Sequence, residues 1–383
     1  MTGVNIHIYP SDFRSESRIV RTAQAIAGFE TFSHIHLIGA RDRDLPDREV
    51  LSGMITLHRL GPRKDRFRSR LTRPIWLVLW SLSTLWFCIR QPLICLNCHS
   101  LPVLPLSALI RWLKSCKLVY DAHELETETG YSKGIRKWLA RRLERRFIHS
   151  CDAHIFVARA ISDWYQARYK LIDPLVIYNV PSAPKDFRAQ PKEGLRQRLS
   201  IPSSQRIALY QGLLGHGRGI ESLIEAVEEQ TDICVVFLGF GPLEDKVARI
   251  AKQSSAVYFH PRVRHEELLA LTASADFGLS LIEPVSLSYE YCMPNKLFEY
   301  MLAGLPVIVS PTQEQRRLVE RYGAGIVADS CSPIDTRVAL KRAITADRDT
   351  MVAGCRMAMK DYSWDRQVDK LRVLYAGLTK RPH

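Results

Sequence analysis

Four glycines and one arginine lie within residues 212–219, GLLGHGRG. A strand-like apolar run precedes them, and a helical pattern over residues 220–227 follows. Glycines let the backbone approach a ligand closely, and the first turn of a helix offers unpaired N–H groups to an anion. An arginine can hold phosphate oxygens through two N–H groups at once. Gly215, Gly217 and Arg218 are therefore candidates to bind a phosphorylated ligand.

A second helix that could hold an anion begins at Pro294, between two strand-like apolar runs, residues 277–282 and 305–310. Proline is tolerated in the first helical turn, because the missing N–H would have no helical partner there. Lys296 lies in that turn, and the positive end of the helix dipole favours a diphosphate at the same place. Glu299 follows one turn later. A carboxylate there would repel the anion unless it accepted hydrogen bonds from neutral hydroxyls, such as those of a ribose.

A histidine and several acids follow a strand-like run in the N-terminal half. Residues 117–120 form the run, and Asp121-Ala122-His123-Glu124 comes directly after it. Ligands gather beyond the carboxyl ends of parallel strands, so His99 and this turn are expected to face a ligand site. An imidazole at His123 can hydrogen-bond a ligand hydroxyl. Of Glu124, Glu126 and Glu128 in this loop, Glu124 is the preferred candidate to act on such a hydroxyl.

Strand-like and helix-like segments alternate through both halves of the chain, which is typical of parallel sheets covered by helices. We predict an α/β protein of two Rossmann-like, doubly wound domains that face each other across a cleft. The predicted parts are a first domain over residues 1–181, a linker over 182–194, a second domain over 195–360, and a helix over 361–383 that crosses back to the first domain. The first strand-to-helix loop lacks the glycines of a dinucleotide site, which argues against a dehydrogenase.

The chain is basic, with 54 Lys and Arg against 40 Asp and Glu and a net charge of +14. Such a charge favours nucleic acid, an anionic membrane or an anionic small molecule. Neither zinc-finger spacing nor basic runs interleaved with aromatics occur, so nucleic acid is not expected. The nine cysteines show no disulfide framework, and no signal peptide begins the chain, which together predict a reducing compartment. Cys95 and Cys98 are predicted to be buried core thiols.

Two segments could lie on a membrane. Residues 74–89 are the most apolar stretch, but sixteen residues are fewer than the ~20 that span a bilayer. Its tryptophans and the basic cluster before it, residues 63–70, are typical of a helix at a membrane interface, although a helix that covers a sheet would look the same. The tryptophans are Trp76, Trp80 and Trp86. Residues 134–148 form a second amphipathic helix, with six basic residues, which suits an anionic leaflet unless it is simply solvated.

The motifs resemble those of one enzyme family. PNKLFEYMLAGLPVIVS, residues 294–310, resembles the donor-sugar segment of retaining glycosyltransferases of family 4, which have the GT-B fold. VYDAHELETE, residues 119–128, resembles the family's strand-end segment, and Trp364 stands where the family's last helix carries a tryptophan. These segments and the glycine-rich loop occur in the family's order and cover almost the full length of the chain.

The resemblance assigns roles to single residues. It implies that His123 lies against the transferred sugar and that Glu299 binds the ribose. The expected catalytic residues are His123, Glu124, Arg218 and Lys296. The expected donor-binding residues are Gly215, Gly217, Arg218, Gly239, Gly241, Val263, Asn295, Lys296, Leu297 and Glu299.

Two positions depart from the family pattern. The family has a glutamate where this chain has Tyr291, and Glu290 and Glu283 lie nearby at other spacings. The family also has an arginine where this chain has Leu213. One of two cations is therefore missing, and Arg218 and Lys296 are expected to neutralise the diphosphate.

Together these features predict a hexosyltransferase-type glycosyltransferase (EC 2.4). It would move a sugar from a UDP or GDP sugar to a lipid-linked or polysaccharide acceptor, with retention and without a metal or cofactor. It would act at the cytoplasmic face of the cell membrane, bound peripherally. A GT-B nucleotide-sugar 2-epimerase and a non-enzymatic protein that binds membranes or nucleic acid are the alternatives.

Overall fold

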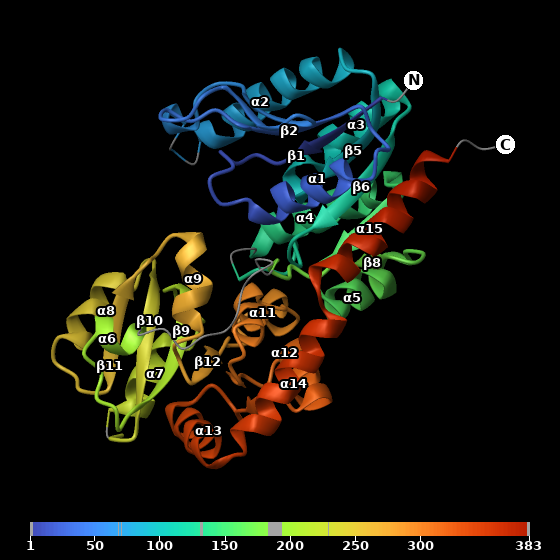
Figure 1. Ribbon diagram of the computed structural model, residues 1–383. Coiled ribbons are helices and arrows are strands. Elements are labelled where there is room, and N and C mark those ends of the chain that lie inside the picture. Colours follow the sequence, from blue (N-terminus) through green and yellow to red (C-terminus); the bar gives the residue numbers. More distant parts are fainter. Residues whose placement is uncertain are drawn as a thin grey trace. The chain divides into compact units, whose positions relative to one another are not determined.

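The computed structural model describes residues 3–67, 69, 71–130, 133–182, 194–228 and 230–380. The chain divides into two compact units, Met1–Ile177 with Gln367–His383, and Tyr178–Arg366. Each unit is built on one sheet with helices on both faces (Figure 1). The predicted α/β class and the two Rossmann-like sheets are confirmed. Most of the predicted linker, and Arg68 and Arg70 of the basic cluster, lie outside the described residues.

The sheet of the first unit has eight strands in the order β3-β4-β2-β1-β5-β6-β7-β8. All neighbours pair in parallel except β3 and β4, which form an antiparallel hairpin at one edge. The inner strands β1 and β5 are mostly apolar and almost entirely buried, as expected for parallel strands covered on both faces. The strands are β1 (Val4–Ile8), β2 (His34–Ala40), β3 (Arg48–Ser52), β4 (Ile55–Leu60), β5 (Leu93–Cys98), β6 (Lys117–Ala122), β7 (Ala153–Phe156) and β8 (Leu175–Val176).

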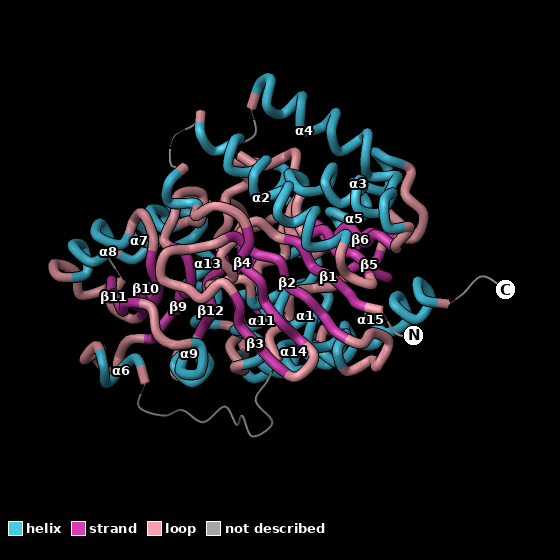
Figure 2. The backbone as a smooth tube through the Cα atoms, turned by 90° about the horizontal axis from the view of Figure 1, so that it is seen from above, coloured by secondary structure: helices cyan, strands magenta, loops and turns pink. Residues whose placement is uncertain are grey.

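The helices of the first unit cover the sheet on both sides. Figure 2 shows α2, α3, α4 and α5 along one side of the strands and α1 on the other. These helices are α1 (Ser17–Ala27), α2 (Thr72–Ile89), α3 (Leu104–Lys114), α4 (Gly134–Phe147) and α5 (Arg159–Tyr169), with short 3-10 turns at Lys64–Arg66, Leu101–Val103 and Ile148–Ser150. The last helix, α15 (Trp364–Thr379), joins this unit from Gln367 onward, and its Tyr375 hydroxyl donates a hydrogen bond to Asn97 on β5.

The second unit has six parallel strands in the order β11-β10-β9-β12-β13-β14. The order reverses beside β9, which is where open parallel sheets bind ligands. Its strands are β9 (Arg206–Leu213), β10 (Ile233–Phe240), β11 (Val257–Pro261), β12 (Phe277–Ser280), β13 (Val307–Val309) and β14 (Gly325–Val327). Its helices are α6 (Leu195–Arg198), α7 (Ile220–Val227), α8 (Glu244–Ala251), α9 (His265–Thr272), α10 (Leu287–Glu290), α11 (Asn295–Leu302), α12 (Gln313–Tyr322), α13 (Pro333–Thr345) and α14 (Arg348–Asp361).

Helix α2 matches the sheet-covering alternative at two of its three tryptophans. Trp76 and Trp80 are buried, and the interpretation of α2 as a membrane-interface helix stays a prediction. Their indole N–H groups donate to backbone oxygens of Pro62 and Gly39, each at 2.9 Å, so tertiary hydrogen bonds hold both rings under the helix. The helix has 18 residues, and by length and composition it could cross a membrane.

The cysteines match the prediction. Cys95 and Cys98 are buried and unpaired, and all nine cysteines are free thiols. Burial raises the pKa of the Cys98 thiol to about 12, so it is protonated at neutral pH.

A histidine pair on β2 and β4 predicts how stability depends on pH. His36 Nδ1 and His58 Nε2 lie 3.1 Å apart, and both rings contact Phe87. Burial lowers the pKa of both histidines to about 4, helped at His36 by His58 and at His58 by Arg48. Between about pH 7 and pH 4, protons therefore bind the unfolded chain more than the folded one. We expect the melting temperature to fall as the pH is lowered through this range, measured by calorimetry.

The double variant His36→Gln/His58→Gln serves as the control for that dependence. Glutamine does not titrate, so the fall in melting temperature between neutral and mildly acidic pH is expected to be shallower than in the unmodified chain. An equal slope would place the pH dependence in other groups.

Candidate active site

A buried cation stands at the start of α11. The side chain of Lys296 is only 8% exposed. Its Nζ has no hydrogen-bond partner among the described residues and lies 3.8 Å from the centroid of the Tyr210 ring. Burial, and next the charge of Arg218, lower the pKa of Lys296 well below its usual range. A buried ammonium without a hydrogen-bond acceptor is costly, so the site is built for an anionic partner.

The glycine-rich loop between β9 and α7 lies against the segment after β12. Gly217 and Gly219 have φ of +74° and +71°, which residues with a side chain rarely adopt. A Cβ at Gly219 would lie 2.4 Å from the backbone oxygen of Leu281, so only glycine fits. This loop carries Arg218, whose guanidinium carbon lies 5.6 Å from the centroid of the Tyr289 ring.

Glu283 fixes that loop from the other side. Its backbone N–H donates to the Gly217 oxygen at 3.1 Å, and its carboxylate accepts from the Gly219 N–H at 3.2 Å. Of the acids near Tyr291, Glu283 is thus engaged with the glycine-rich loop. These two hydrogen bonds explain the position of Glu283 without a ligand.

Gln211 holds the carboxylate of Glu299, and sequence reasoning missed it. The Gln211 amide donates to Glu299 Oε2 at 2.5 Å and accepts from the Thr272 hydroxyl at 2.7 Å. The Gln211 backbone N–H donates to the Tyr300 hydroxyl at 2.9 Å. Its only signal in the sequence is a polar residue inside an apolar strand. The predicted ribose contact of Glu299 stays a prediction, and Gln211 orients the carboxylate for it.

The other residues predicted to bind the donor nucleotide sugar differ in burial. Leu297 is fully buried, and its N–H donates to the Pro294 oxygen at 3.1 Å, so its side chain belongs to the core, and its predicted donor contact stays a prediction. Asn295, beside it, is exposed at the helix start, and Gly215 is buried. A Cβ at Gly239 would lie 1.9 Å from the Gly212 oxygen, and one at Gly241 would lie 2.6 Å from the Leu214 oxygen. Gly239, near the end of β10, and Gly241, just after it, therefore allow close packing against the end of β9 and the loop that follows it.

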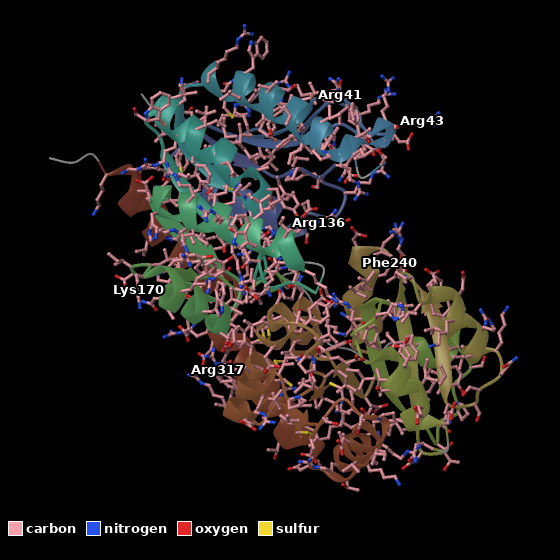
Figure 3. All side chains as sticks on the ribbon, turned by 180° about the vertical axis from the view of Figure 1, so that it is seen from behind. Arg41, Arg43, Arg136, Lys170, Phe240 and Arg317 are labelled. Carbon is pink, nitrogen blue, oxygen red and sulfur yellow. The ribbon has the colours of Figure 1, made fainter. Side chains whose placement is uncertain are left out.

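The carboxyl end of β10 also presents an aromatic ring. Phe240 is 46% exposed and carries the Arg262 guanidinium 5.3 Å from its centroid (Figure 3). Val263 is half-buried just beyond β11. A flat exposed ring at this edge suits stacking by a nucleobase.

In the first unit, a chain of histidines lies at the ends of β1, β5 and β6. His7 Nδ1 lies 2.8 Å from His99 Nε2, and His99 Nδ1 lies 3.2 Å from His123 Nε2. Asp121 Oδ2 lies 3.3 Å from His99, and Asp121 Oδ1 accepts from Arg18 at 2.9 Å. The predicted His99 and His123 are brought together, whereas His7 was missed because nothing in a short apolar strand marks it.

Burial and charge set the protonation of this cluster. Burial, with the charge of His99, lowers the pKa of His7 well below its usual range, and burial also lowers the pKa of His99. Although burial alone would raise it, Arg18 and the two neighbouring histidines hold the pKa of Asp121 well below its usual range. The carboxylate is therefore ionised and orients the neutral His99 imidazole.

The same residues could hold a metal ion. One ligand atom from each of His99, Asp121 and His123 lies within 4.8 Å of the others. Asp121 is, however, already bound by the Arg18 cation, which opposes a second positive charge. The predicted independence from metal stays a prediction.

The three glutamates in the loop after β6 have different surroundings. Glu128 is buried and bonds Lys137 and Arg141 at 2.6 and 2.5 Å, so it anchors α4. Glu124 is exposed, as an acceptor-side residue would be. Glu126 is half-buried, and burial, with the charge of Glu124, raises its pKa to about 8.

Comparisons with known proteins agree with this geometry. Residues 23–180 match a family model described as Glycosyltransferase Family 4, and residues 220–356 match one described as Glucosyltransferase 3-like, C-terminal domain. The sequence is 24% identical over 189 residues (48% of this chain, 44% of the relative) to a putative colanic acid biosynthesis glycosyl transferase of Escherichia coli. It is 32% identical over 118 residues (30% of this chain, 28% of the relative) to a putative teichuronic acid biosynthesis glycosyltransferase of Bacillus subtilis. These matches span less than half the length of each of the two relatives.

Two solved structures share the fold over nearly the whole chain. Sucrose-phosphate synthase from Thermosynechococcus elongatus has a TM-score of 0.78 at 15% identity, with 98% of this chain and 99% of that chain covered. Anabaena Alr3699/HepE in complex with UDP-glucose has a TM-score of 0.70 at 15% identity, with 98% and 100% covered.

Proposed function

Because this chain belongs to glycosyltransferase family 4 and has the GT-B fold, we propose that it transfers a sugar from a UDP-sugar to a cell-envelope glycan or its lipid-linked precursor. The observation that carries the proposal is the buried Lys296 Nζ at the start of α11, which has no hydrogen-bond partner among the described residues and feels the charge of Arg218. A diphosphate supplies the charge and the acceptors that this ammonium lacks.

Support for the donor and the acceptor comes from relatives. Alr3699/HepE was solved with UDP-glucose, which favours a uridine nucleotide. The colanic acid and teichuronic acid relatives favour an envelope polysaccharide as product. The free thiols suit a reducing compartment, in line with action on the cytoplasmic side.

In the reaction, the bond between the anomeric carbon and the diphosphate breaks, and negative charge grows on the leaving phosphate oxygen. Arg218, Lys296 and the N–H groups at the start of α11 stabilise that charge, so no metal is required. Glu299, oriented by Gln211, accepts from the ribose hydroxyls. As the family resemblance implies, His123 serves the transferred sugar, and the acceptor hydroxyl attacks the anomeric carbon from the face that the diphosphate leaves, with retention. The proton of that hydroxyl passes to the leaving phosphate oxygen.

A thermal-shift series in EDTA tests this function. UDP and UDP-sugars are expected to raise the melting temperature equally with and without EDTA, by roughly 2.7 kcal/mol of stability at a ligand concentration a hundred times Kd. ADP serves as the comparison. Stabilisation that appears only with added metal, or none with any nucleotide diphosphate, would contradict the donor assignment.

A nucleotide-sugar 2-epimerase is the second candidate, favoured by one observation. The raised pKa of Glu126, about 8, provides a carboxyl group that can exchange a proton near neutral pH. Product analysis with donor alone separates the two reactions, because an epimerase converts the sugar without an acceptor.

A further inference from the structure

The outer surfaces of α2, α3 and α4 carry an unusual share of the exposed apolar side chains. Of the 22 large apolar side chains exposed among the described residues, twelve lie on these three helices. They include all three exposed tryptophans: Trp86 on α2 at 55%, Trp112 on α3 at 75% and Trp138 on α4 at 57%. Helix α3 contacts both α2 and α4, so the three helices form one continuous surface (Figure 2), which we call the tryptophan face.

Internal contacts fix the orientation of each outer helix. Trp76, Trp80, Thr84 and Cys88 recur at every fourth position and are the buried residues of α2, which turns Val78, Leu82 and Trp86 outward. On α4 the only buried residue is Glu144, whose carboxylate accepts hydrogen bonds from the hydroxyls of Tyr120, Tyr165 and Tyr169. The exposed apolar residues are therefore not needed for packing within this unit.

The charges around the tryptophan face have one sign. None of the three helices carries an acidic residue except the buried Glu144. Arg136, Arg142, Arg145 and Arg146 of α4 are exposed (Figure 3 labels Arg136). The Arg142 guanidinium carbon lies 5.1 Å from the Trp138 ring centroid, and that of Arg90 lies 3.3 Å from the Trp86 ring centroid. Tryptophan beside arginine is the pattern of a surface that meets lipid headgroups.

We propose that the tryptophan face docks this protein on an anionic phospholipid bilayer, with the three helices lying in the headgroup layer. A second copy of the chain is a poor occupant, because it would bring two rows of arginines together. Nucleic acid would use the arginines but not the apolar side chains. Helix α2, about 27 Å long at 1.5 Å per residue, lies on the membrane and does not cross it, because its buried side is bonded to β2 and to the loop after β4.

Vesicle sedimentation tests the proposal. We expect the protein to pellet with vesicles of phosphatidylcholine containing about a third phosphatidylglycerol. It should not pellet with phosphatidylcholine alone, and high salt or alkaline carbonate should release it. The variant Arg142→Gln/Arg145→Gln/Arg146→Gln should lower the partition coefficient by about 100-fold, since each basic residue near an anionic surface is worth about fivefold. The variant Trp112→Ser/Trp138→Ser should lower it by at least about tenfold.

Matched controls come from the exposed surface of the other unit and of α15. Arg249→Gln/Lys252→Gln/Lys341→Gln removes the same charge elsewhere, and Val373→Ser removes an equally exposed apolar side chain. Both are expected to bind like the unmodified chain. The UDP-induced thermal shift of every variant is expected to be unchanged. This measurement reports folding and donor binding independently of membrane binding.

Four outcomes would overturn the proposal. The first is binding to phosphatidylcholine vesicles that equals binding to vesicles with phosphatidylglycerol. The second is a loss of vesicle binding in the control variants as large as in the test variants. The third is resistance to alkaline carbonate, which would make α2 a membrane span. The fourth is a dimer in solution that the tryptophan variant dissociates, which would make the face an interface between copies.

Discussion

Replacing Arg218 by alanine is expected to slow sugar transfer by about 10²–10³-fold, or roughly 2–4 kcal/mol of transition-state stabilisation. Arg218 lies on the glycine loop whose φ values and close contact with Leu281 leave little freedom, so its guanidinium is held in place before the donor binds. The charge that it meets is largest when the bond to the diphosphate is breaking. We therefore expect kcat to fall more than KM rises in steady-state kinetics with a UDP-sugar.

Two further variants separate charge from geometry. Arg218→Lys keeps the positive charge and loses the two-pronged hydrogen bond, so it should fall between the alanine variant and the unmodified chain. Arg316→Ala, at an exposed position on α12, should be neutral. Full turnover in Arg218→Ala would show that the diphosphate is bound elsewhere.

The fold could be read from the sequence where strands are buried on both faces. A continuous apolar run such as Ile233–Phe240 predicts a strand by itself. The β3–β4 hairpin was missed, because Arg48–Ser52 is an edge strand with alternating exposure and three polar residues out of five. Such a segment becomes a strand only because it pairs with β4, and this pairing cannot be predicted from the local sequence.

The residues of the candidate site also divide into those that a local sequence pattern marks and those that it does not. Arg218 and Lys296 were found because glycines and a helix start mark them locally. Gln211 and His7 were not, because their partners Glu299 and His99 lie 88 and 92 residues away in sequence. A single polar residue inside an apolar strand indicates a buried hydrogen-bond network. Which residue it bonds, however, depends on the order of the strands in the sheet.

Replacing Lys296 by methionine is expected to stabilise the fold and abolish efficient transfer. Methionine has a similar length and needs no hydrogen bond, so removal of the buried ammonium should raise the free energy of unfolding by about 1–3 kcal/mol. The loss of one of the two cations proposed to face the diphosphate should lower kcat/KM by at least about 10²-fold. Chemical denaturation and steady-state kinetics on the same sample measure both effects.

The pH dependence of that stabilisation identifies its cause. The pKa of Lys296 is lowered on folding, so between its folded and unfolded pKa values the unfolded chain binds the extra proton, and stability rises with pH. The advantage of Lys296→Met should therefore shrink as the pH rises toward the usual lysine pKa of about 10.4. Saturating UDP should shrink it too, because the nucleotide pairs the ammonium in the unmodified chain only. If Lys296→Met is instead less stable at every pH, packing of the lysine on Tyr210 dominates, and the claim that this ammonium is kept for an anion fails. Lys341→Met, at an exposed position, should show none of these changes.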